Sequence, residues 1–471
     1  MTTIDLTQIT QKLLHDSPGD DGISLDTSQG LDDATFNKWA KRFGLDPEGS
    51  NYIVRPNQFH DFDDASFDPD ADGDVPIGYM TMPPPSKRAI TETEGNDDEF
   101  GTECILRYSL KEHIFSYPHF PSPIPRPEKP AYEIRESPGK GVGMYALRAL
   151  SAGELIIAER PMLLGPPAVN VQLVWRRGFT HEDKSKVSLL EWEKLLETVF
   201  KRMPPENQKA YMELANSHTH DGSGPLLGRF RTNGLGIDTL VDPFRTSHAI
   251  HSGICKDISR VNHSCGPNAG RAFDIATFCF ELRAARPISA GEEITIHYCS
   301  VMDKCSLRQD QLKPYGFRCT CPSCTNHVVS DKRRASLHSL APLFMQWMQD
   351  RSLPGDYVIK ECLRLIAVIK EEGLETHPLY REYLELISKC YDALGDVGQS
   401  VSFLRQLKLF DKVNKSPLYA SYALKQLGEQ LIALSRARVP PESEKKKKKK
   451  SKKKAAKPAD AAPEPLEETV D

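Results

Sequence analysis

The stretch RVNHSCGPN at residues 260–268 decides how the fold of this chain is interpreted. Within four positions it carries an amide, an imidazole and a thiol, on Asn262, His263 and Cys265. Such side chains hold metal ions or hydrogen-bond to ligands, yet a single histidine is more often a structural hydrogen-bonding residue. The meaning of this stretch therefore depends on the motifs that surround it.

Three cysteines crowd into residues 319–324, in the pattern C-x-C-x2-C. Thiols this close cannot all belong to disulfides without strain, whereas a structural zinc ion takes four ligands that are often thiolates. We therefore predict a structural Zn²⁺ site; a cysteine-rich turn without a metal is the alternative. The fourth ligand must come from elsewhere, and we choose Cys265 over the competing Cys299 and Cys305. The predicted ligands are the thiols of Cys265, Cys319, Cys321 and Cys324.

The composition indicates a globular protein with polar flanking regions. Of the 471 residues, 39% are hydrophobic, and the net charge of −4 gives the whole chain no nucleic-acid-binding signature. The 11 cysteines are unevenly spread, with none between Cys104 and Cys255, which favours reduced thiols and metal binding over a disulfide framework. We find no long apolar window and no signal-peptide pattern. We therefore expect no membrane span and a location in the nucleus, the cytoplasm or both.

Shifts in composition divide the chain into regions of different character. We expect a largely disordered acidic region at 1–116, a proline-rich linker at 117–131, a mixed domain at 132–325, a helical domain at 331–437 and a disordered lysine-rich tail at 438–471.

The mixed domain combines short strands with a helical insertion, so we expect an α+β fold. Glycine turns bracket strands at about 142–149 and 154–159, and further strands are expected between about 225 and 300. Apolar residues at helical spacing over 186–217 predict two helices, within an insertion at about 165–225.

The region 331–437 has helical periodicity throughout and predicts about five helices of 14–20 residues in antiparallel pairs. The segment 377–412 resembles a tetratricopeptide-like helix pair, so these helices are candidates for binding partner proteins. The lysine-rich run at 445–454 is either a nuclear-localisation or nucleic-acid-contact signal or a solvated tail.

Four motifs in order along the chain resemble the SET domain. They are GKGVGMYA at 139–146, RVNHSCGPN at 260–268, GEEITIHY at 291–298 and the Y-x-F-x-C-x-C-x2-C run at 315–324. Within that superfamily the chain is most similar to the SMYD branch and its fungal relatives, over about 132–325. The resemblance implies methyl transfer from S-adenosylmethionine (SAM) to a lysine of a protein substrate. It also implies a SET domain of short sheets, with the cysteine motif at 315–324 as a zinc-bound post-SET cap.

The same resemblance assigns roles to individual residues. Asn262 and His263 are implied to contact SAM through amide and backbone groups, and Phe317 to pack on the adenine. Tyr298 is implied to stand at the inner end of the lysine channel as the catalytic residue. The residues implied to bind SAM are Lys140, Gly141, Val142, Gly143, Asn262, His263, Tyr298 and Phe317.

These residue types suit the implied chemistry, because in-line methyl transfer needs a neutral, aligned amine. A buried tyrosine hydroxyl such as that of Tyr298 can orient the amine without becoming charged. SMYD proteins carry a MYND zinc finger inside the split SET region, and we expect that finger to be missing here because residues 105–254 contain no cysteine. The rival interpretations are a SET-fold binding protein without catalysis and a helical scaffold that recruits partners.

Overall fold

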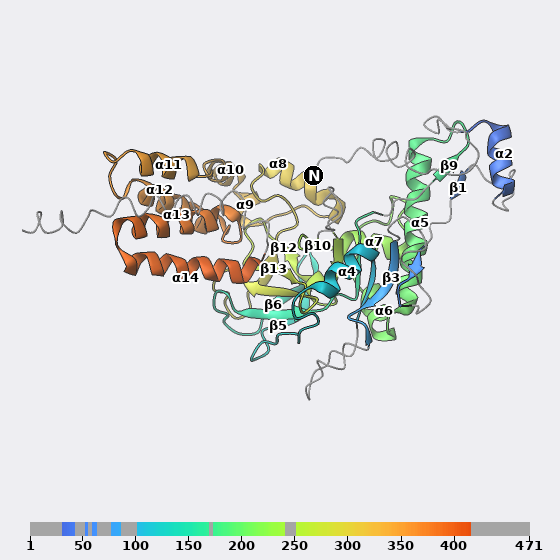
Figure 1. The fold of residues 1–471 in the computed structure, drawn as a ribbon, viewed down its shortest axis with the longest axis horizontal. Helices are drawn as coiled ribbons and strands as arrows, with labels where there is room; N and C mark the ends of the chain where they lie inside the picture. Colours follow the sequence, from blue (N-terminus) through green and yellow to red (C-terminus); the bar gives the residue numbers. More distant parts are fainter. Residues whose placement is uncertain are drawn as a thin grey trace, which may run out of the picture. The chain divides into compact units, whose positions relative to one another are not determined.

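The computed structural model describes residues 31–42, 52–54, 59–63, 77–85, 101–168, 173–240 and 251–415, and Figure 1 shows their helices and strands. The chain divides into two compact units. The first contains residues 1–327 with 413–415, and the second contains residues 328–412 with 416–471.

The first unit is built on several β-sheets, each of which joins strands from distant parts of the chain (Figure 1). The four-stranded sheet has the order β12 (Asn262–His263), β15 (Glu293–Ile296), β6 (Gly141–Ala146) and β5 (Tyr132–Ser137). The three-stranded sheet has the order β13 (Ala269–Asp274), β14 (Cys279–Ala284) and β7 (Leu155–Glu159). The six-stranded sheet has the order β10 (Leu235–Ile237), β11 (His251–Ile254), β8 (Leu163–Gly165), β4 (Thr102–Arg107), β3 (Ile77–Met82) and β2 (His60–Asp61). The two-stranded sheet pairs β1 (Tyr52–Val54) with β9 (Leu173–Trp175). With the helices below, these sheets confirm the predicted α+β fold class.

The four-stranded sheet positions the stretch RVNHSCGPN at residues 260–268. Strand β12 runs parallel to β15, with His263 level with Ile296. The Asn268 side chain reinforces this pairing, because its oxygen accepts from the Thr295 N–H at 2.8 Å and its amide donates to the Glu293 carbonyl at 2.8 Å. The loop between β12 and β13 is therefore fixed at both ends.

The chain enters β12 through a short 3-10 helix, η2 (Ile258–Arg260), which is anchored by Glu159 at the end of β7. The Glu159 carboxylate accepts from the backbone N–H groups of Lys256, Asp257 and Ile258 at 2.6 to 3.0 Å. Burial and the nearby charge of Asp257 raise the pKa of Glu159 to about 7. One side chain thus satisfies the N–H groups that begin a helix and fixes the path into β12.

The insertion consists of three helices, α5 (His181–Arg202), α6 (Pro205–Met212) and α7 (Pro225–Asn233). The two helices predicted over 186–217 are confirmed as α5 and α6. The expectation that strands return at about 225 is wrong there, because α7 occupies that position. Its first turn is stabilised from a distance: the Glu193 carboxylate of α5 accepts from the N–H groups of Leu226 at 2.9 Å and Leu227 at 2.6 Å.

Part of the region expected to be disordered belongs to the folded unit. The expectation for residues 1–116 is wrong for β3, β4 and α4 (Tyr108–Ser116). Strand β4 lies inside the six-stranded sheet, antiparallel to β3 and parallel to β8, and five of its six residues are buried. Its partner β8 lies far along the chain, so the local acidic composition did not reveal the strand. Residues 117–131 form neither helix nor strand.

The second unit is helical over its described residues. The helices of this region are α10 (His327–Ala335), α11 (Ala341–Gln349), α12 (Tyr357–Glu372), α13 (Pro378–Leu394) and α14 (Val397–Asn414). The last three have 16, 17 and 18 residues and match the expected length, whereas α10 and α11 have nine residues each. Gly373 and Gly395 end α12 and α13 in the left-handed conformation, which glycine adopts without steric cost. Residues 416–437 and the lysine-rich tail lie outside the described residues.

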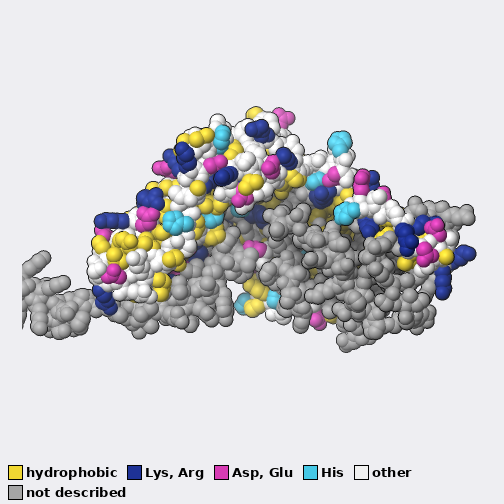
Figure 2. All heavy atoms as spheres, turned by 90° about the horizontal axis from the view of Figure 1, so that it is seen from above, with side chains coloured by type: hydrophobic (Ala, Val, Ile, Leu, Met, Phe, Trp, Pro, Cys, Tyr) yellow, Lys and Arg dark blue, Asp and Glu magenta, His cyan; other side chains and the backbone are white. Residues whose placement is uncertain are grey.

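Two surface properties bear on the expected partners. Among the helices in the described ranges, none has the length and apolar character needed to cross a membrane. On the coloured part of the face in Figure 2, basic and acidic side chains are interspersed, in keeping with the small net charge of −4.

The N-cap of α13 makes the stability of the helical unit dependent on pH. His377 Nδ1 accepts from the Leu379 N–H at 3.2 Å, and burial and the nearby Arg334 lower the pKa of His377 to about 4. Between pH 6.5 and 4 the unfolded chain therefore binds more protons at this position than the folded chain, so stability falls as the pH falls. We expect a slope of up to about 1.4 kcal/mol per pH unit from this residue.

The His377→Asn variant keeps a cap acceptor but does not titrate, so its melting temperature should fall less between pH 6.5 and 4 than that of the wild type. His338→Asn replaces an exposed histidine of the same unit and serves as the control. If the melting temperatures of the wild type and of His377→Asn fell by the same amount between pH 6.5 and 4, the cap would not be the source of the pH dependence.

Candidate functional site

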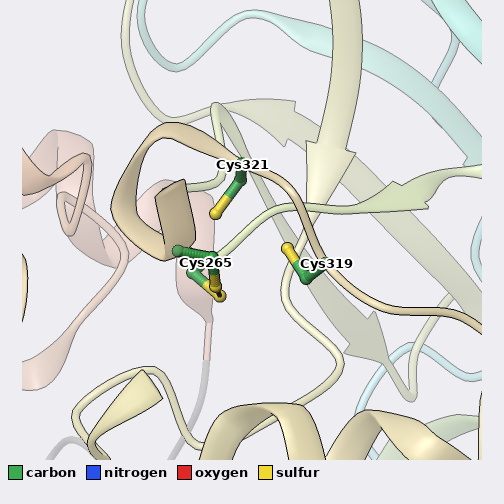
Figure 3. A group of neighbouring side chains, drawn as sticks. Cys265, Cys319 and Cys321 are labelled. Carbon is green, nitrogen blue, oxygen red and sulfur yellow. Dashed lines mark hydrogen bonds between the residues drawn. The ribbon is translucent and has the colours of Figure 1, made fainter. Parts of the chain in front are cut away.

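Four cysteines from separated parts of the chain meet beside the end of β12. The sulfur atoms of the four all lie within 4.8 Å of one another. Three of these side chains are labelled in Figure 3, where their sulfur atoms face one another. The group consists of Cys265, Cys319, Cys321 and Cys324, the four thiols predicted as zinc ligands.

The folding of the segment around α8 (Cys305–Leu312) and α9 (Pro322–Thr325) brings these thiols together. Gln309 of α8 holds the backbone of Cys319, because its amide donates to the Cys319 carbonyl at 2.8 Å and its oxygen accepts from the Cys319 N–H at 3.0 Å. Cys321 occupies the N-cap position of α9, which places Cys324 one turn later, with its sulfur 3.5 Å from that of Cys265.

A buried arginine shows that this cluster suits negative charge. Arg308 is fully buried, with one nitrogen donating to the Asp303 carbonyl at 2.6 Å and another 3.8 Å from the Cys324 sulfur. Burial alone would lower the pKa of Arg308, but the sulfur atoms of Cys265 and Cys324 raise it above its ordinary value. Buried charges need opposite charges nearby. Four thiolates around Zn²⁺ carry a net charge of 2−, so the donor set, its spacing and the arginine all fit a tetrahedral zinc ion.

His263, Cys265 and Cys299 form a second group of side chains that could bind a metal, but hydrogen bonding explains their arrangement better. His263 Nε2 lies 3.3 Å from the Cys265 sulfur and 3.9 Å from the Cys299 sulfur. However, His263 Nδ1 accepts from the Tyr298 N–H at 3.0 Å, which places the proton of a neutral ring on Nε2. The Nε2–H group therefore donates to Cys265. His263 thus connects the backbone of Tyr298 with one of the four clustered thiols.

The other side of β12 faces the glycine turn between β5 and β6. Asn262 donates through its side-chain amide to the Val142 carbonyl at 3.1 Å and to Glu293 Oε1 at 2.9 Å. Glu293 Oε2 accepts from Lys140 Nζ at 2.6 Å. Three of the residues implied to bind SAM therefore lie around one carboxylate, Lys140, Gly143 and Asn262, and Val142 is connected to it through Asn262.

Tyr298, Tyr315 and Phe317 form an aromatic group beside His263. The Tyr298 ring lies 5.4 Å from that of His263 and 4.9 Å from that of Tyr315, measured between centroids. Phe317 lies 6.1 Å from His263 and is 38% exposed, so one aromatic surface remains open for stacking. The Tyr298 hydroxyl donates to the Val261 carbonyl at 2.5 Å, and burial raises the pKa of Tyr298 well above its ordinary value. This phenol stays neutral near neutral pH.

Sequence reasoning missed several residues that build this site. Glu293 belongs to the motif GEEITIHY, which assigns it no role, and no motif contains Arg308 or Gln309. A glutamate at the start of a strand that follows a glycine turn is an ordinary sequence feature. Only the parallel pairing of β12 with β15 reveals that Glu293 is a neighbour of Asn262.

Comparisons with known proteins agree with this geometry. The SET domain family matches residues 141–299. The chain is 30% identical over 216 residues to the histone-lysine N-methyltransferase set5 of Schizosaccharomyces pombe, covering 45% of this chain and 57% of that protein. It is 27% identical over 234 residues to the human histone-lysine N-methyltransferase SMYD1, covering 46% of this chain and 43% of that protein. The chain thus spans about half the length of these relatives.

Among solved structures, the SET domain of LSMT bound to lysine and AdoHcy aligns over 70% of this chain and 91% of that chain. The sequence identity in this alignment is 12%, and the TM-score is 0.23.

The metal site predicts a definite pattern of zinc retention. We expect the purified protein to hold about one zinc ion per chain, and substitution of any of the four clustered cysteines by serine to release it. Cys299→Ser and Cys305→Ser serve as matched controls and should retain the metal. Elemental analysis by mass spectrometry measures the content. Zinc loss in Cys299→Ser with retention in Cys265→Ser would contradict our choice of the fourth ligand.

Arg308 should contribute to zinc affinity through its charge. Arg308→Met removes the charge and keeps an extended side chain, so we expect the affinity to fall about 10- to 100-fold, the usual effect of losing a residue that supports metal ligands. Arg308→Lys keeps the charge and should lose less. Competition with a coloured chelator measures both affinities. Equal losses in the two variants would show that packing, and not charge, is what Arg308 supplies.

Proposed function

Because this chain contains a SET domain related to those of the SMYD and Set5 lysine methyltransferases, we propose that it transfers a methyl group from SAM to a lysine side chain of a protein. The observation that supports this proposal most strongly is that β12 holds Asn262 against the glycine turn and, through His263, contacts Tyr298 on its other side. The two known relatives described above are histone-lysine methyltransferases by name. Both histones and other proteins are therefore proposed as substrates.

Tyr298 suits the role of orienting the substrate amine. Its hydroxyl hydrogen is used in the bond to the Val261 carbonyl, so the oxygen lone pairs are left to accept from an amine N–H. Its raised pKa keeps the phenol neutral, so Tyr298 holds the amine in line without removing its proton. The lysine must then arrive, or become, neutral by release of its proton to water.

The proposed cofactor position lies along the glycine turn and β12. SAM supplies the methyl group on a sulfonium, which is attacked by an amine in line with the breaking bond. Lys140 offers a cation for a carboxylate, and the exposed Phe317 offers a ring for the adenine. Asn262 has committed its amide hydrogens to protein oxygens and so offers its oxygen as an acceptor.

The proposed zinc ion has a structural role. It would be held by the four thiols of Cys265, Cys319, Cys321 and Cys324 and would fix the segment that carries Phe317 against β12, which carries His263. We further propose that the helical unit binds partner proteins and that the protein acts in the nucleus, the cytoplasm or both.

The test of catalysis is the Tyr298→Phe variant with radiolabelled SAM and whole-cell extract as the source of substrates. We expect labelling to fall at least about 100-fold because the amine loses its orienting group, while SAM affinity changes by less than about threefold. Scintillation counting and calorimetry measure the two quantities.

Tyr211→Phe is the matched control, since the Tyr211 hydroxyl, like that of Tyr298, donates to a backbone carbonyl, that of Leu226 at 2.9 Å. It should label extract as the wild type does. Equal labelling by Tyr298→Phe and the wild type would reject the catalytic role. SAM binding without any labelling by the wild type would favour a binding protein.

A further inference from the structure

The Glu293 carboxylate joins its own strand, β15, to two other segments of the first unit that are far away in the sequence, β12 and the hairpin of β5 and β6. Its Oε1 atom accepts from Asn262 Nδ2 at 2.9 Å and from Ser137 Oγ at 2.8 Å. Its Oε2 atom accepts from Lys140 Nζ at 2.6 Å. The partners belong to β12, to the end of β5 and to the turn between β5 and β6. One side chain therefore determines where two residues of the proposed cofactor site lie.

This arrangement fixes which end of the Asn262 amide is available. The two amide hydrogens of Asn262 point to the Val142 carbonyl and to Glu293. The amide plane is thereby oriented, and its oxygen is left as the hydrogen-bond acceptor. An acceptor of this kind binds an ammonium group.

Gly143 makes the close approach of these groups possible. A Cβ atom at this position would lie 2.8 Å from Glu293 Oε1, 2.9 Å from Asn262 Nδ2 and 3.2 Å from the Ser137 Cβ. Any side chain at 143 would therefore push the carboxylate away from its partners. Gly143, which the resemblance implies to bind SAM, therefore has a second role: it leaves the space that the hydrogen bonds of Glu293 need.

The charges of the network are also defined. Burial alone would raise the pKa of Glu293, but the hydrogen bonds from Lys140, Asn262 and Ser137 lower it below its ordinary value. The side chain is 17% exposed, whereas that of Lys140 is 42% exposed. An ammonium has three N–H donors, so Lys140 keeps two for another acceptor while it stays bound to Glu293. The network therefore presents a held cation beside an oriented amide oxygen.

We propose that Glu293 is a positioning residue for the amino-acid end of SAM, an inference that rests on the proposed function. Glu293 holds Lys140 where it meets the α-carboxylate, and it turns the Asn262 oxygen toward the α-ammonium. Glu293 therefore contributes to the affinity for ligands that carry an α-amino acid and not to the binding of the adenosine part. The residue touches neither the methyl group nor the substrate amine, so it acts on affinity and not on the chemical step.

The test compares SAM with 5′-methylthioadenosine, which lacks the amino-acid chain and, with it, the positive charge on sulfur. In Glu293→Gln the side-chain oxygen still accepts from Asn262 and Ser137, but the amide nitrogen faces Lys140 and releases it. We expect the Kd for SAM to rise about tenfold, as for the loss of one charge-assisted hydrogen bond, and the Kd for methylthioadenosine to change less than about twofold. Calorimetry measures both values. Lys140→Met should likewise raise the Kd for SAM and leave the Kd for methylthioadenosine nearly unchanged.

Glu292→Gln is the matched control, because this neighbouring carboxylate accepts from Asn268 at 2.9 Å and from the Ser289 N–H at 2.9 Å and contacts neither Lys140 nor Asn262 through any described bond. Any weakening that it causes should fall equally on the two ligands. Zinc content and melting temperature establish that each variant is folded.

The outcomes separate this inference from the function on which it rests. If the wild type binds SAM and Glu293→Gln binds both ligands as the wild type does, the positioning role is rejected and the proposed function stands. Equal weakening of both ligands would reduce Glu293 to a general support of the fold and would also overturn the inference. Failure of the folded wild type to bind SAM would overturn the proposed function and the inference with it.

Discussion

The parallel pairing of β12 with β15 is the constraint on which the site depends. It is only two residues long, but it places Asn262 beside Thr295 and sets the loop that follows. Asn268 closes that loop onto β15 through two hydrogen bonds of 2.8 Å. Without this pairing, neither Glu293 nor the sulfur of Cys265 would meet its partners, because all of them come from separate segments of the chain.

Much of the site could be predicted because its chemistry is written in short motifs. The spacing of Cys319, Cys321 and Cys324 indicated a metal site, and the structure brings Cys265 to them with all four sulfur atoms within 4.8 Å. The helix over 186–202 was visible as apolar periodicity, since an amphipathic helix repeats its pattern locally. Local patterns sufficed wherever the physical cause was itself local.

The elements that sequence patterns did not predict are stabilised by contacts between residues far apart in the sequence. Strand β4 is buried between β3 and β8, and helix α7 begins on the carboxylate of Glu193, so both are stabilised by partners distant in the sequence. The same holds for Arg308, whose charge is explained only by thiols that fold around it. A polar residue in a loop or helix gives no sign of such a partner until the tertiary contacts are known.

The hydrogen bond from His263 to Cys265 has a thermodynamic consequence. One four-residue segment, 262–265, carries a thiol of the metal cluster, the amide proposed to meet the cofactor and the ring that accepts from the backbone of Tyr298. The binding of two ligands to one segment is thermodynamically linked. Any factor by which zinc raises the affinity for SAM is also the factor by which SAM raises the affinity for zinc. Under the proposed function, occupancy of the metal site and occupancy of the methyl-donor site would then be coupled through this segment.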